Sequence, residues 1–326
     1  MDKQRRIILA GLAAAPLAGA AGAIGALISQ PVFAQTAGKK YRFGFSQVTT
    51  VEPWRVQFNK DMKAEAAKHP GVDLIIADAG DRTDKQNADM ENFIAQKMDA
   101  IFISPKESAG LTGVVEKAYK AGIPVFVLDR KVNGDAYTQF IGGDNVQIGQ
   151  KAGEFIVKLM GGPGAAKGNL VEIWGGFGAQ PAHDRHDGAF SVIGKQSGIK
   201  LVGERVDCDW KQDKAYEYMK TVLRMNPKID VVYGHNDPMA YGAYLAAKDA
   251  GREKNIKFVG IDGLPQEGAT WVEQGLLAGT FMYPTPGAEG IRQALKLLSG
   301  EKIPKEVTLA TQGIFPDNAK TYIASH

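Results

Sequence analysis

The chain has 326 residues, of which 39 are basic and 36 acidic, so its formal net charge is only +3. A charge this small lacks the basic surface that neutralises phosphates, which excludes nucleic acid as an expected partner. Cys208 is the single cysteine, so no internal disulfide can form and the apolar core must hold the fold by itself.

Residues 1–34 have the pattern of a cleaved export signal. Lys3, Arg5 and Arg6 come first, and an uncharged run rich in Ala and Gly extends from Ile7 to Ile28. The small residues of Val32-Phe33-Ala34 suit signal peptidase, so we predict cleavage after Ala34. The arginine pair and the mild hydrophobicity favour a twin-arginine signal, with the Sec route left open. A permanent transmembrane anchor is the alternative, because the run could span about 30 Å of hydrocarbon.

From Tyr41 onward, short apolar runs alternate with longer amphipathic stretches, which predicts repeated β-α units and parallel sheets. The apolar runs are continuous, so we expect strands that are covered on both faces. The predicted strands are Phe43–Val48, Leu74–Asp78, Ala100–Ser104, Pro124–Asp129, Phe140–Gly143, Leu170–Gly175, Leu201–Arg205, Val231–His235, Lys257–Ile261 and Thr280–Pro284. The predicted helices are Arg55–Lys68, Lys85–Gln96, Gly110–Ala121, Gln147–Met160, Lys211–Met225, Met239–Ala250 and Pro286–Leu298.

The glycine-dense segment Gly161–Gly168 invites interpretation as a phosphate cradle. A phosphate-binding loop follows a strand and precedes a helix, whereas this segment precedes a predicted strand and ends Lys167-Gly168-Asn169. The order therefore predicts a helix-to-strand loop.

Functional side chains gather at the ends of the predicted strands and in the segments that follow them, where ligands bind in open parallel sheets. They are Ser46-Gln47, Trp54-Arg55, Asp129-Arg130, Arg185, Asn236-Asp237 and Asp262. A carboxylate accepts from two hydroxyl groups, a guanidinium donates to several oxygens, and an aromatic face covers the C–H side of a sugar ring. These residue types suit a neutral polyhydroxylated ligand. The alternative is that Asp129–Arg130 and Asp262–Arg185 are ion pairs that only stabilise the sheet ends.

Several segments carry a resemblance to a known family. They are Phe43–Val48 (FGFSQV), Asp99–Pro105 (DAIFISP), Ile123–Arg130 (IPVFVLDR), Gly234–Ala243 (GHNDPMAYGA) and Val259–Gly263 (VGIDG). In this order they resemble the periplasmic pentose- and hexose-binding proteins of ABC transporters, nearest to the ribose- and galactofuranose-binding branch. The match runs across nearly all of residues 41–315.

The resemblance implies an α/β fold of two Rossmann-like, doubly wound parallel-sheet domains joined by three hinge crossings, the type I periplasmic binding protein fold. The crossings would fall near Asp144–Asn145, Tyr283–Pro284 and Thr308–Leu309. The first lobe would then comprise residues 40–144 and 284–308, and the second lobe residues 145–283 and 309–326. Closure about the hinges would bury a sugar between the lobes, and the permease would recognise the closed shape.

The resemblance also implies roles for individual residues. Asp129 and Arg130 would hold sugar hydroxyls from the first lobe, and Arg185, Asn236 and Asp262 from the second. Trp54 and Trp210 match stacking aromatics. Asn145 falls at the first crossing and Tyr283 at the second, where ribose binders carry a glutamine.

The first loop departs from the ribose-binding pattern. Glu52-Pro53-Trp54-Arg55 stands where ribose binders typically show Asn-Pro-Phe-Phe, so Glu52 replaces an amide and Arg55 replaces a ring. Ribose itself is therefore not the expected ligand. The Trp-Arg pair is similar to the galactofuranose binder, from which Glu52 and Tyr283 depart.

We therefore expect a periplasmic, monomeric, non-enzymatic solute-binding protein without cofactor or metal, whose partners are a monosaccharide and an inner-membrane ABC permease. A sugar or polyol sensor that feeds a chemoreceptor is an alternative. A metal-dependent hydrolase is a weaker one, since only His183 and His186 suggest metal ligands. A sugar-responsive repressor would need a DNA-binding motif where the export signal lies.

Overall fold

The computed structural model describes residues 40–326. The predicted signal peptide, its cleavage after Ala34 and the twin-arginine pair lie outside these residues. Within residues 40–326, no helix combines the length and the apolar character needed to cross a bilayer.

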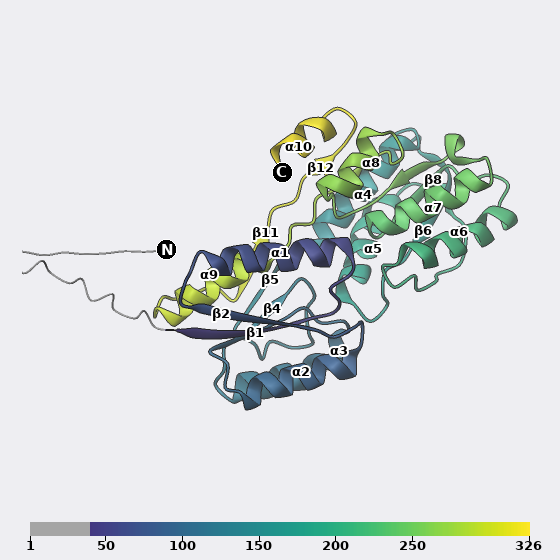
Figure 1. The fold of residues 1–326 in the computed structure, drawn as a ribbon. Helices are drawn as coiled ribbons and strands as arrows, with labels where there is room; N and C mark the ends of the chain where they lie inside the picture. The colour runs from purple at the N-terminus through teal and green to yellow at the C-terminus, as the bar shows by residue number, and fades with distance from the viewer. Residues whose placement is uncertain (1–39) are drawn as a thin grey trace, which may run out of the picture. The chain divides into compact units, whose positions relative to one another are not determined.

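A six-stranded, fully parallel sheet forms the first half of the fold, with the strand order β11-β5-β4-β3-β1-β2. We call it the first sheet (Figure 1). Its strands are β1 (Tyr41–Gln47), β2 (Val72–Asp78), β3 (Ala100–Ile103), β4 (Val125–Leu128), β5 (Gln139–Gly143) and β11 (Glu306–Leu309). The helices that connect or cover them are α1 (Pro53–Ala67), α2 (Thr83–Ala95), α3 (Ser108–Lys120) and α9 (Gly287–Leu298).

A four-stranded parallel sheet forms the other half, with the strand order β7-β6-β8-β9, and we call it the second sheet. Its strands are β6 (Lys167–Ile173), β7 (Gly198–Leu201), β8 (Val231–Gly234) and β9 (Lys257–Val259), with the antiparallel pair β10 (Thr280–Phe281) and β12 (Gly313–Ile314) beside it. The helices of this part are α4 (Asn145–Leu159), α5 (Gln180–Ile193), α6 (Gln212–Met225), α7 (Asp237–Asp249), α8 (Thr270–Glu273) and α10 (Ala319–Ser325). This part also contains the short 3-10 helix η1 (Glu253–Asn255) and the short π-helix η2 (Pro265–Ala269).

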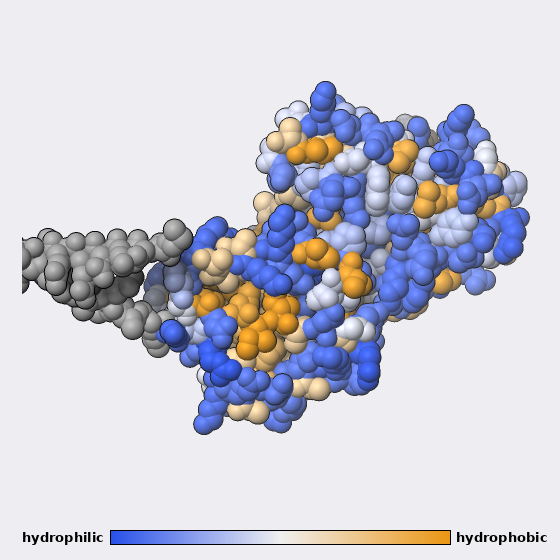
Figure 2. All heavy atoms as spheres, viewed as in Figure 1, coloured by the Kyte–Doolittle hydropathy of each residue, from blue (hydrophilic) through white to orange (hydrophobic). Residues whose placement is uncertain are grey.

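The central strands are buried on both faces, which explains their continuous apolar sequences. Every residue of β3, β4 and β8 is buried, and β3 reads Ala-Ile-Phe-Ile. The edge strand β2 differs, because its residues are only partly covered. Apolar side chains gather near this edge on the face shown in Figure 2. The expected α/β class with parallel sheets is confirmed.

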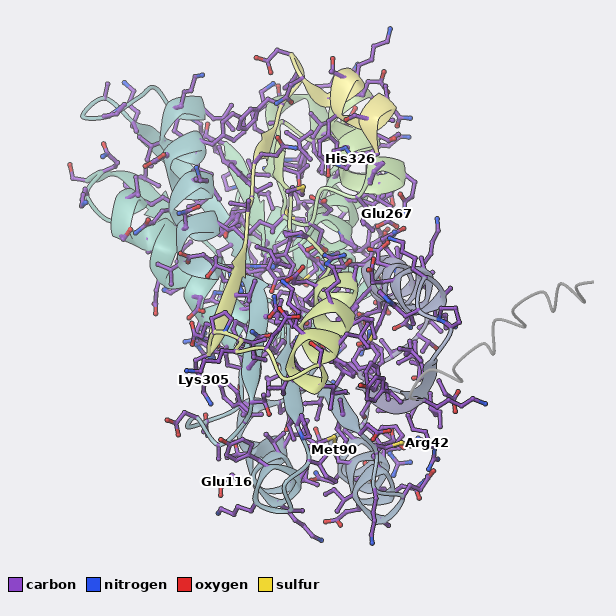
Figure 3. The ribbon with its side chains drawn as sticks, turned by 90° about the vertical axis from the view of Figure 1, so that its left-hand side faces the viewer. Arg42, Met90, Glu116, Glu267, Lys305 and His326 are labelled. Carbon is purple, nitrogen blue, oxygen red and sulfur yellow. The ribbon has the colours of Figure 1, made fainter. Side chains whose placement is uncertain are left out.

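The chain passes between the two sheets more than once. It leaves the first sheet after β5, returns with α9 and β11, and leaves again before β12. Figure 3 shows α9 and β11 beside the first sheet, although both follow β10 in the sequence. Strand β11 pairs in parallel with β5, with Val307 opposite Ile141.

The fold corrects one predicted strand and adds five α-helices and β-strands that were not predicted. The strand predicted at Leu201–Arg205 lies earlier, at Gly198–Leu201, because it is an edge strand whose residues are half-exposed or exposed and give only a weak apolar signal. Helix α5 was absent from the predicted helices, and so were β11, β12, α8 and α10. The segment Gly161–Gly168 joins α4 to β6, as predicted, with its last two residues in the strand.

Helix α5 packs closely against α4 because glycines remove the side chains between them. A Cβ atom at Gly188 would lie 2.2 Å from the Val146 carbonyl oxygen, and one at Gly149 would lie 2.4 Å from the Arg185 carbonyl oxygen. This close approach fixes the position of α5, which carries Arg185.

Cys208 is a buried part of the second-sheet core. Burial, together with the negative charge of Asp207, raises the pKa of its thiol to about 12.

Candidate ligand-binding site

A cavity lies between groups from the two sheets. Most of the residues predicted as a site from the sequence line this one cavity. Its lining residues are Glu52, Trp54, Arg55, Asp129, Arg130, Pro181, Arg185, Trp210, Asn236, Asp262 and Tyr283. These residues are distant in the sequence, and they meet because they lie at the ends of strands or in the loops and helix starts that follow them.

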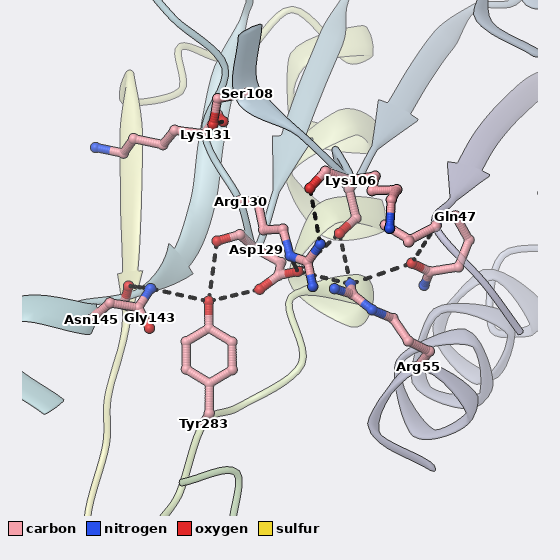
Figure 4. A network of polar contacts seen from close by, with 12 residues as sticks. Gln47, Arg55, Lys106, Ser108, Asp129, Arg130, Lys131, Gly143, Asn145 and Tyr283 are labelled. Carbon is pink, nitrogen blue, oxygen red and sulfur yellow. Dashed lines mark hydrogen bonds and ion pairs between the residues drawn. The ribbon is translucent and has the colours of Figure 1, made fainter. Parts of the chain in front are cut away.

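Arg55 and Asp129 form the centre of the first-sheet wall (Figure 4). Arg55 lies in the first turn of α1, and Asp129 directly follows β4. Arg55 Nη1 donates to Asp129 Oδ2 at 2.8 Å and to Ser104 Oγ at 2.7 Å. Ser104 Oγ in turn donates to Asp129 Oδ2 at 2.9 Å. All three side chains are buried, so their polar atoms depend on each other.

The protonation of this wall follows from its charges. Burial alone would raise the pKa of Asp129, but the positive charges of Arg55 and Arg130 and the hydrogen bond from Tyr283 hold it below its ordinary value. Burial, reinforced by the nearby charge of Arg55, lowers the pKa of Arg130 to about 10. At neutral pH, Asp129 is therefore a carboxylate and Arg130 is a cation.

Arg130 keeps most of its donors free of protein acceptors. Its Nη1 donates to the Lys106 carbonyl oxygen at 3.2 Å, and its Nε lies 3.6 Å from Asp129 Oδ2. Its guanidinium also lies over the ring of Trp210, at 5.2 Å from the centroid. Arg130 can thus offer hydrogen bonds to oxygens in the cavity.

Arg185 is the central group of the second-sheet wall. It projects from α5, its Nε donates to Asn145 Oδ1 at 2.9 Å, and its Nη1 donates to the His235 carbonyl oxygen. Its Nη1 lies 3.9 Å from Asp262 Oδ1, which is too long for a hydrogen bond. Asp262 therefore retains acceptor capacity on the cavity side.

Asp262 belongs to a group of buried acids. Burial raises its pKa well above the ordinary value despite the charge of Arg185, and the neighbouring Asp237 and Glu267 raise it further. Asp237 lies behind it and accepts hydrogen bonds from the Gly263 N–H at 2.7 Å and Thr280 Oγ1 at 2.6 Å. A single guanidinium thus faces several carboxyl groups.

Tyr283 lies between the two walls. Its hydroxyl donates to Asp129 Oδ1 at 2.9 Å, and it receives a hydrogen bond from Asn145 Nδ2 at 3.4 Å. One face of its ring stacks on Trp54 at a centroid distance of 5.3 Å. The Arg185 guanidinium lies 4.7 Å from its centroid. Trp54 therefore gives stacking surface to Tyr283.

Asn236 and Trp210 complete the second-sheet side. Asn236 Oδ1 caps α7 by accepting from the Met239 N–H at 2.9 Å, and Asn236 Nδ2 donates to the Trp210 carbonyl oxygen at 3.0 Å. The Trp210 ring lies against Gly175, where a Cβ atom would come within 2.5 Å of it. The glycines after β6 therefore make room for this aromatic ring.

Three cavity residues have a positive φ that L-residues rarely adopt. The φ angles are 67° at Asp129, 65° at Trp210 and 131° at Asp262. Such backbone costs on the order of 1–3 kcal/mol per residue and is concentrated at functional sites. The surrounding hydrogen bonds offset this conformational cost and hold the three side chains in the cavity.

Three residues predicted in the site do not line the cavity. Ser46 and Gln47 are fully buried behind it, where Gln47 Oε1 lies 3.4 Å from Arg55 Nη1. Asn145 is also buried, and it bridges Arg185 and Tyr283. The structure thus places these three residues behind the lining side chains. Pro181, which the sequence did not single out, lines the cavity.

A cluster of four alternating charges joins the two sides beside the cavity, and we call it the charge clasp. Lys106 Nζ lies 2.5 Å from Asp81 Oδ1 and 3.4 Å from Asp209 Oδ1. Lys211 Nζ lies 2.5 Å from Asp81 Oδ2 and 2.7 Å from Asp209 Oδ2. Asp81 and Lys106 come from first-sheet loops, and Asp209 and Lys211 precede α6. Sequence patterns give no signal for it, because its members are far apart in the chain.

His183 and His186 do not converge on one point. His183 Nε2 contacts the Phe177 carbonyl oxygen at 2.8 Å, whereas His186 Nδ1 contacts Glu172 at 2.9 Å. Among residues 40–326, no cluster of three or more His, Cys, Asp or Glu side chains could hold a metal ion.

Residues 43–302 match the family described as the periplasmic binding protein domain. The chain belongs to this family. The galactofuranose-binding protein YtfQ of Escherichia coli (strain K12) is 32% identical, over 85% of this chain and 88% of the relative. The ribose import binding protein RbsB of Bacillus subtilis (strain 168) is 30% identical, over 83% of this chain and 86% of the relative.

Solved structures of sugar-binding proteins are also similar. The fructose-binding periplasmic domain of a hybrid two-component system has a TM-score of 0.83 at 40% identity, over 87% of this chain and 94% of that domain. A galactofuranose-binding protein has a TM-score of 0.81 at 31% identity, over 87% of this chain and 98% of that protein. The resemblance to the sugar-binding branch of the family is confirmed by these relatives.

Proposed function

We propose that the chain is the solute-binding component of an ABC importer and that it binds a monosaccharide, a pentose or hexose in pyranose or furanose form. One observation carries this proposal: guanidinium, carboxylate, amide and aromatic groups from both sheets meet in a single cavity. Such a set offers donors, acceptors and C–H contacts together, which a neutral polyol needs and an apolar ligand does not.

Opening and closing of two lobes is part of the proposal. The first lobe comprises residues 40–144 and 284–308, and the second lobe residues 145–283 and 309–326. The passages of the chain after β5, before α9 and after β11 support these boundaries. A ligand that contacts Arg130 on one side and Asp262 on the other stabilises the closed arrangement, because both contacts exist together only there.

The remaining properties follow from this role. We propose that the mature protein begins after Ala34, is periplasmic and monomeric, delivers its sugar to an inner-membrane permease and catalyses no reaction. The names of the ribose import and D-allose-binding periplasmic relatives support transport in that compartment.

A sensory role is the second candidate. It is favoured by the similarity, at 40% identity, to the periplasmic domain of a hybrid two-component system. Uptake of a radiolabelled sugar by cells with and without this chain separates the two roles, because loss of uptake supports an importer component. Unchanged uptake with a lost transcriptional response supports a sensor.

Binding is tested by a thermal-shift screen of residues 35–326 against pentoses, hexoses and polyols, followed by calorimetry of the hits. A ligand at about 100 times its Kd adds about 2.7 kcal/mol of stability, which raises the Tm by several degrees. Arg130→Lys loses the planar fork and is expected to weaken binding by about tenfold or more. Arg224→Lys, at an exposed arginine that contacts Thr221, is the matched control. A complete absence of hits would contradict the proposal.

A further inference from the structure

The Asp129 carboxylate is already occupied by protein donors. Its Oδ2 accepts from Arg55 at 2.8 Å and from Ser104 at 2.9 Å, and its Oδ1 accepts from the Tyr283 hydroxyl at 2.9 Å. Two carboxylate oxygens have about four acceptor positions in total. About one acceptor position, on Oδ1, therefore remains for a hydroxyl group of a ligand, although Asp129 lines the cavity.

In the part of the chain that the structure describes, the Tyr283 hydroxyl has two acceptors within reach, and both belong to Asp129: Oδ1 at 2.9 Å and the carbonyl oxygen at 3.1 Å. The ring is also held on several sides. The Trp54 ring stacks on the Tyr283 ring with 5.3 Å between the centroids, and Arg185 Cζ lies 4.7 Å from the Tyr283 centroid. One ring edge packs on Gly143, where a Cβ atom would lie 2.6 Å from Tyr283 Cε2. The main chain is fixed as well, since the Tyr283 carbonyl oxygen accepts from Trp54 Nε1 at 2.9 Å and its N–H donates to the Asp262 carbonyl oxygen at 3.0 Å.

The part of Tyr283 that meets a ligand is therefore apolar. Its hydroxyl already donates a hydrogen bond to Asp129, and its ring presents C–H groups to the cavity that it lines. A ligand hydroxyl placed against the face or edge of this ring would lose its water without gaining an acceptor from it, and an unpaired buried polar group is costly. A methyl or methylene group at this position would lose no hydrogen bond.

We propose that Tyr283 is a specificity-determining residue: its hydroxyl takes the place of a ligand hydroxyl at Asp129, so the site selects a monosaccharide with a deoxygenated carbon facing Tyr283. The ligand remains a polyol elsewhere, because Arg130, Asp262 and Asn236 still face the cavity. Asp129 is then a positioning residue that holds Arg55 and Tyr283. This inference rests on the proposed sugar-binding function.

The experiment compares the tightest-binding sugar of the screen with each of its monodeoxy derivatives, or with its hydroxylated parent if it is itself a deoxy sugar. Kd values are measured by calorimetry on the wild type and on Tyr283→Phe, which keeps the ring and its stacking. The matched control is Tyr216→Phe, which removes a tyrosine hydroxyl bonded to Asp249 at 2.6 Å outside the cavity.

We expect the wild type to bind one deoxy form about tenfold more tightly than its hydroxylated counterpart. In Tyr283→Phe, the freed Asp129 oxygen accepts from the ligand, so the preference falls to about threefold or less. Tyr216→Phe keeps the wild-type ratio. The ratio of two Kd values on one protein is insensitive to a general loss of stability, so it separates selectivity from folding.

Equal or tighter wild-type binding of the hydroxylated sugar at every carbon would overturn the inference while leaving sugar binding intact. A deoxy preference that persists in Tyr283→Phe would overturn the role of Tyr283. Binding of no sugar at all would overturn the proposed function, and this inference with it.

Discussion

Arg55 Nη1 lies 2.8 Å from Asp129 Oδ2, and both side chains are almost fully buried. Arg55→Met would leave the carboxylate without its main cation. We expect a loss of about 3–5 kcal/mol in the free energy of unfolding, because the removal of one member of a buried ion pair is strongly destabilising. Urea denaturation followed by circular dichroism measures it.

The control for this substitution is Arg82→Met, which breaks an ion pair with Asp84 whose side chains are 65% and 67% exposed. No measurable change is expected there, since water replaces the partner. Equal destabilisation by the two variants would show that the Arg55–Asp129 pair has no special role.

The charge clasp predicts a salt-sensitive affinity. Asp81 contacts both lysines, so Asp81→Asn would weaken the contact between the two sides of the cavity and raise the Kd for sugar by about threefold to tenfold at low salt. Calorimetry at about 0.05 M and about 0.5 M NaCl checks this, since screening at high salt should remove most of the difference. Asp84→Asn serves as the control, and an unaltered salt dependence in Asp81→Asn would refute the idea.

The raised pKa of Glu267 leads us to expect that stability depends on pH. Burial, together with the charge of Asp237, raises its pKa from 4.5 to about 7. Between these values the folded protein holds a proton that the unfolded chain has released, so this group lowers stability as pH rises through that window. Glu267→Gln should therefore match the wild type in Tm near pH 4 and exceed it near pH 8. A Tm difference that is constant over this range would exclude the assignment.

The close approach of α4 and α5 leaves no room for a side chain at Gly188. In Gly188→Ala, the new Cβ atom would meet the Val146 carbonyl oxygen at 2.2 Å, so the helices must separate. We expect a loss of about 1–3 kcal/mol in stability, and weaker sugar binding because α5 carries Arg185. Gly113→Ala in α3 meets nothing within 4 Å and should stabilise the protein by about 0.5–1 kcal/mol. Chemical denaturation compares the two, and similar values would rule out the steric explanation.

The strands and most helices could be predicted because their sequences carry strong local signals. Continuous apolar runs such as Ala100–Ile103 fit only strands that are buried on both faces. Helix α5 lacked such a signal, because its start, Gln180–Asp187, is largely polar. Its contact face is made of small residues such as Gly188, which hydrophobic periodicity does not register.

Most residues of the candidate site could be predicted from the sequence. Their contacts with one another could be predicted only in part. Residues after parallel strands meet at one edge, which brought Asp129 and Asp262 into one cavity. Local sequence cannot tell which side chains pair there. The bond between Tyr283 and Asp129 joins residues 154 positions apart. The resemblance gave Trp54 a sugar-stacking role, and its contact with Tyr283 depends on the same long-range packing.

The burial of Cys208 makes this chain a convenient background for site-specific labelling. Because its thiol is shielded and its pKa is raised to about 12, it reacts slowly with maleimides at neutral pH. A cysteine introduced beside the cavity, for example at exposed Val51, would then take up a fluorophore selectively without removal of the native thiol. The protein could thereby be converted into an optical reporter of its own ligand.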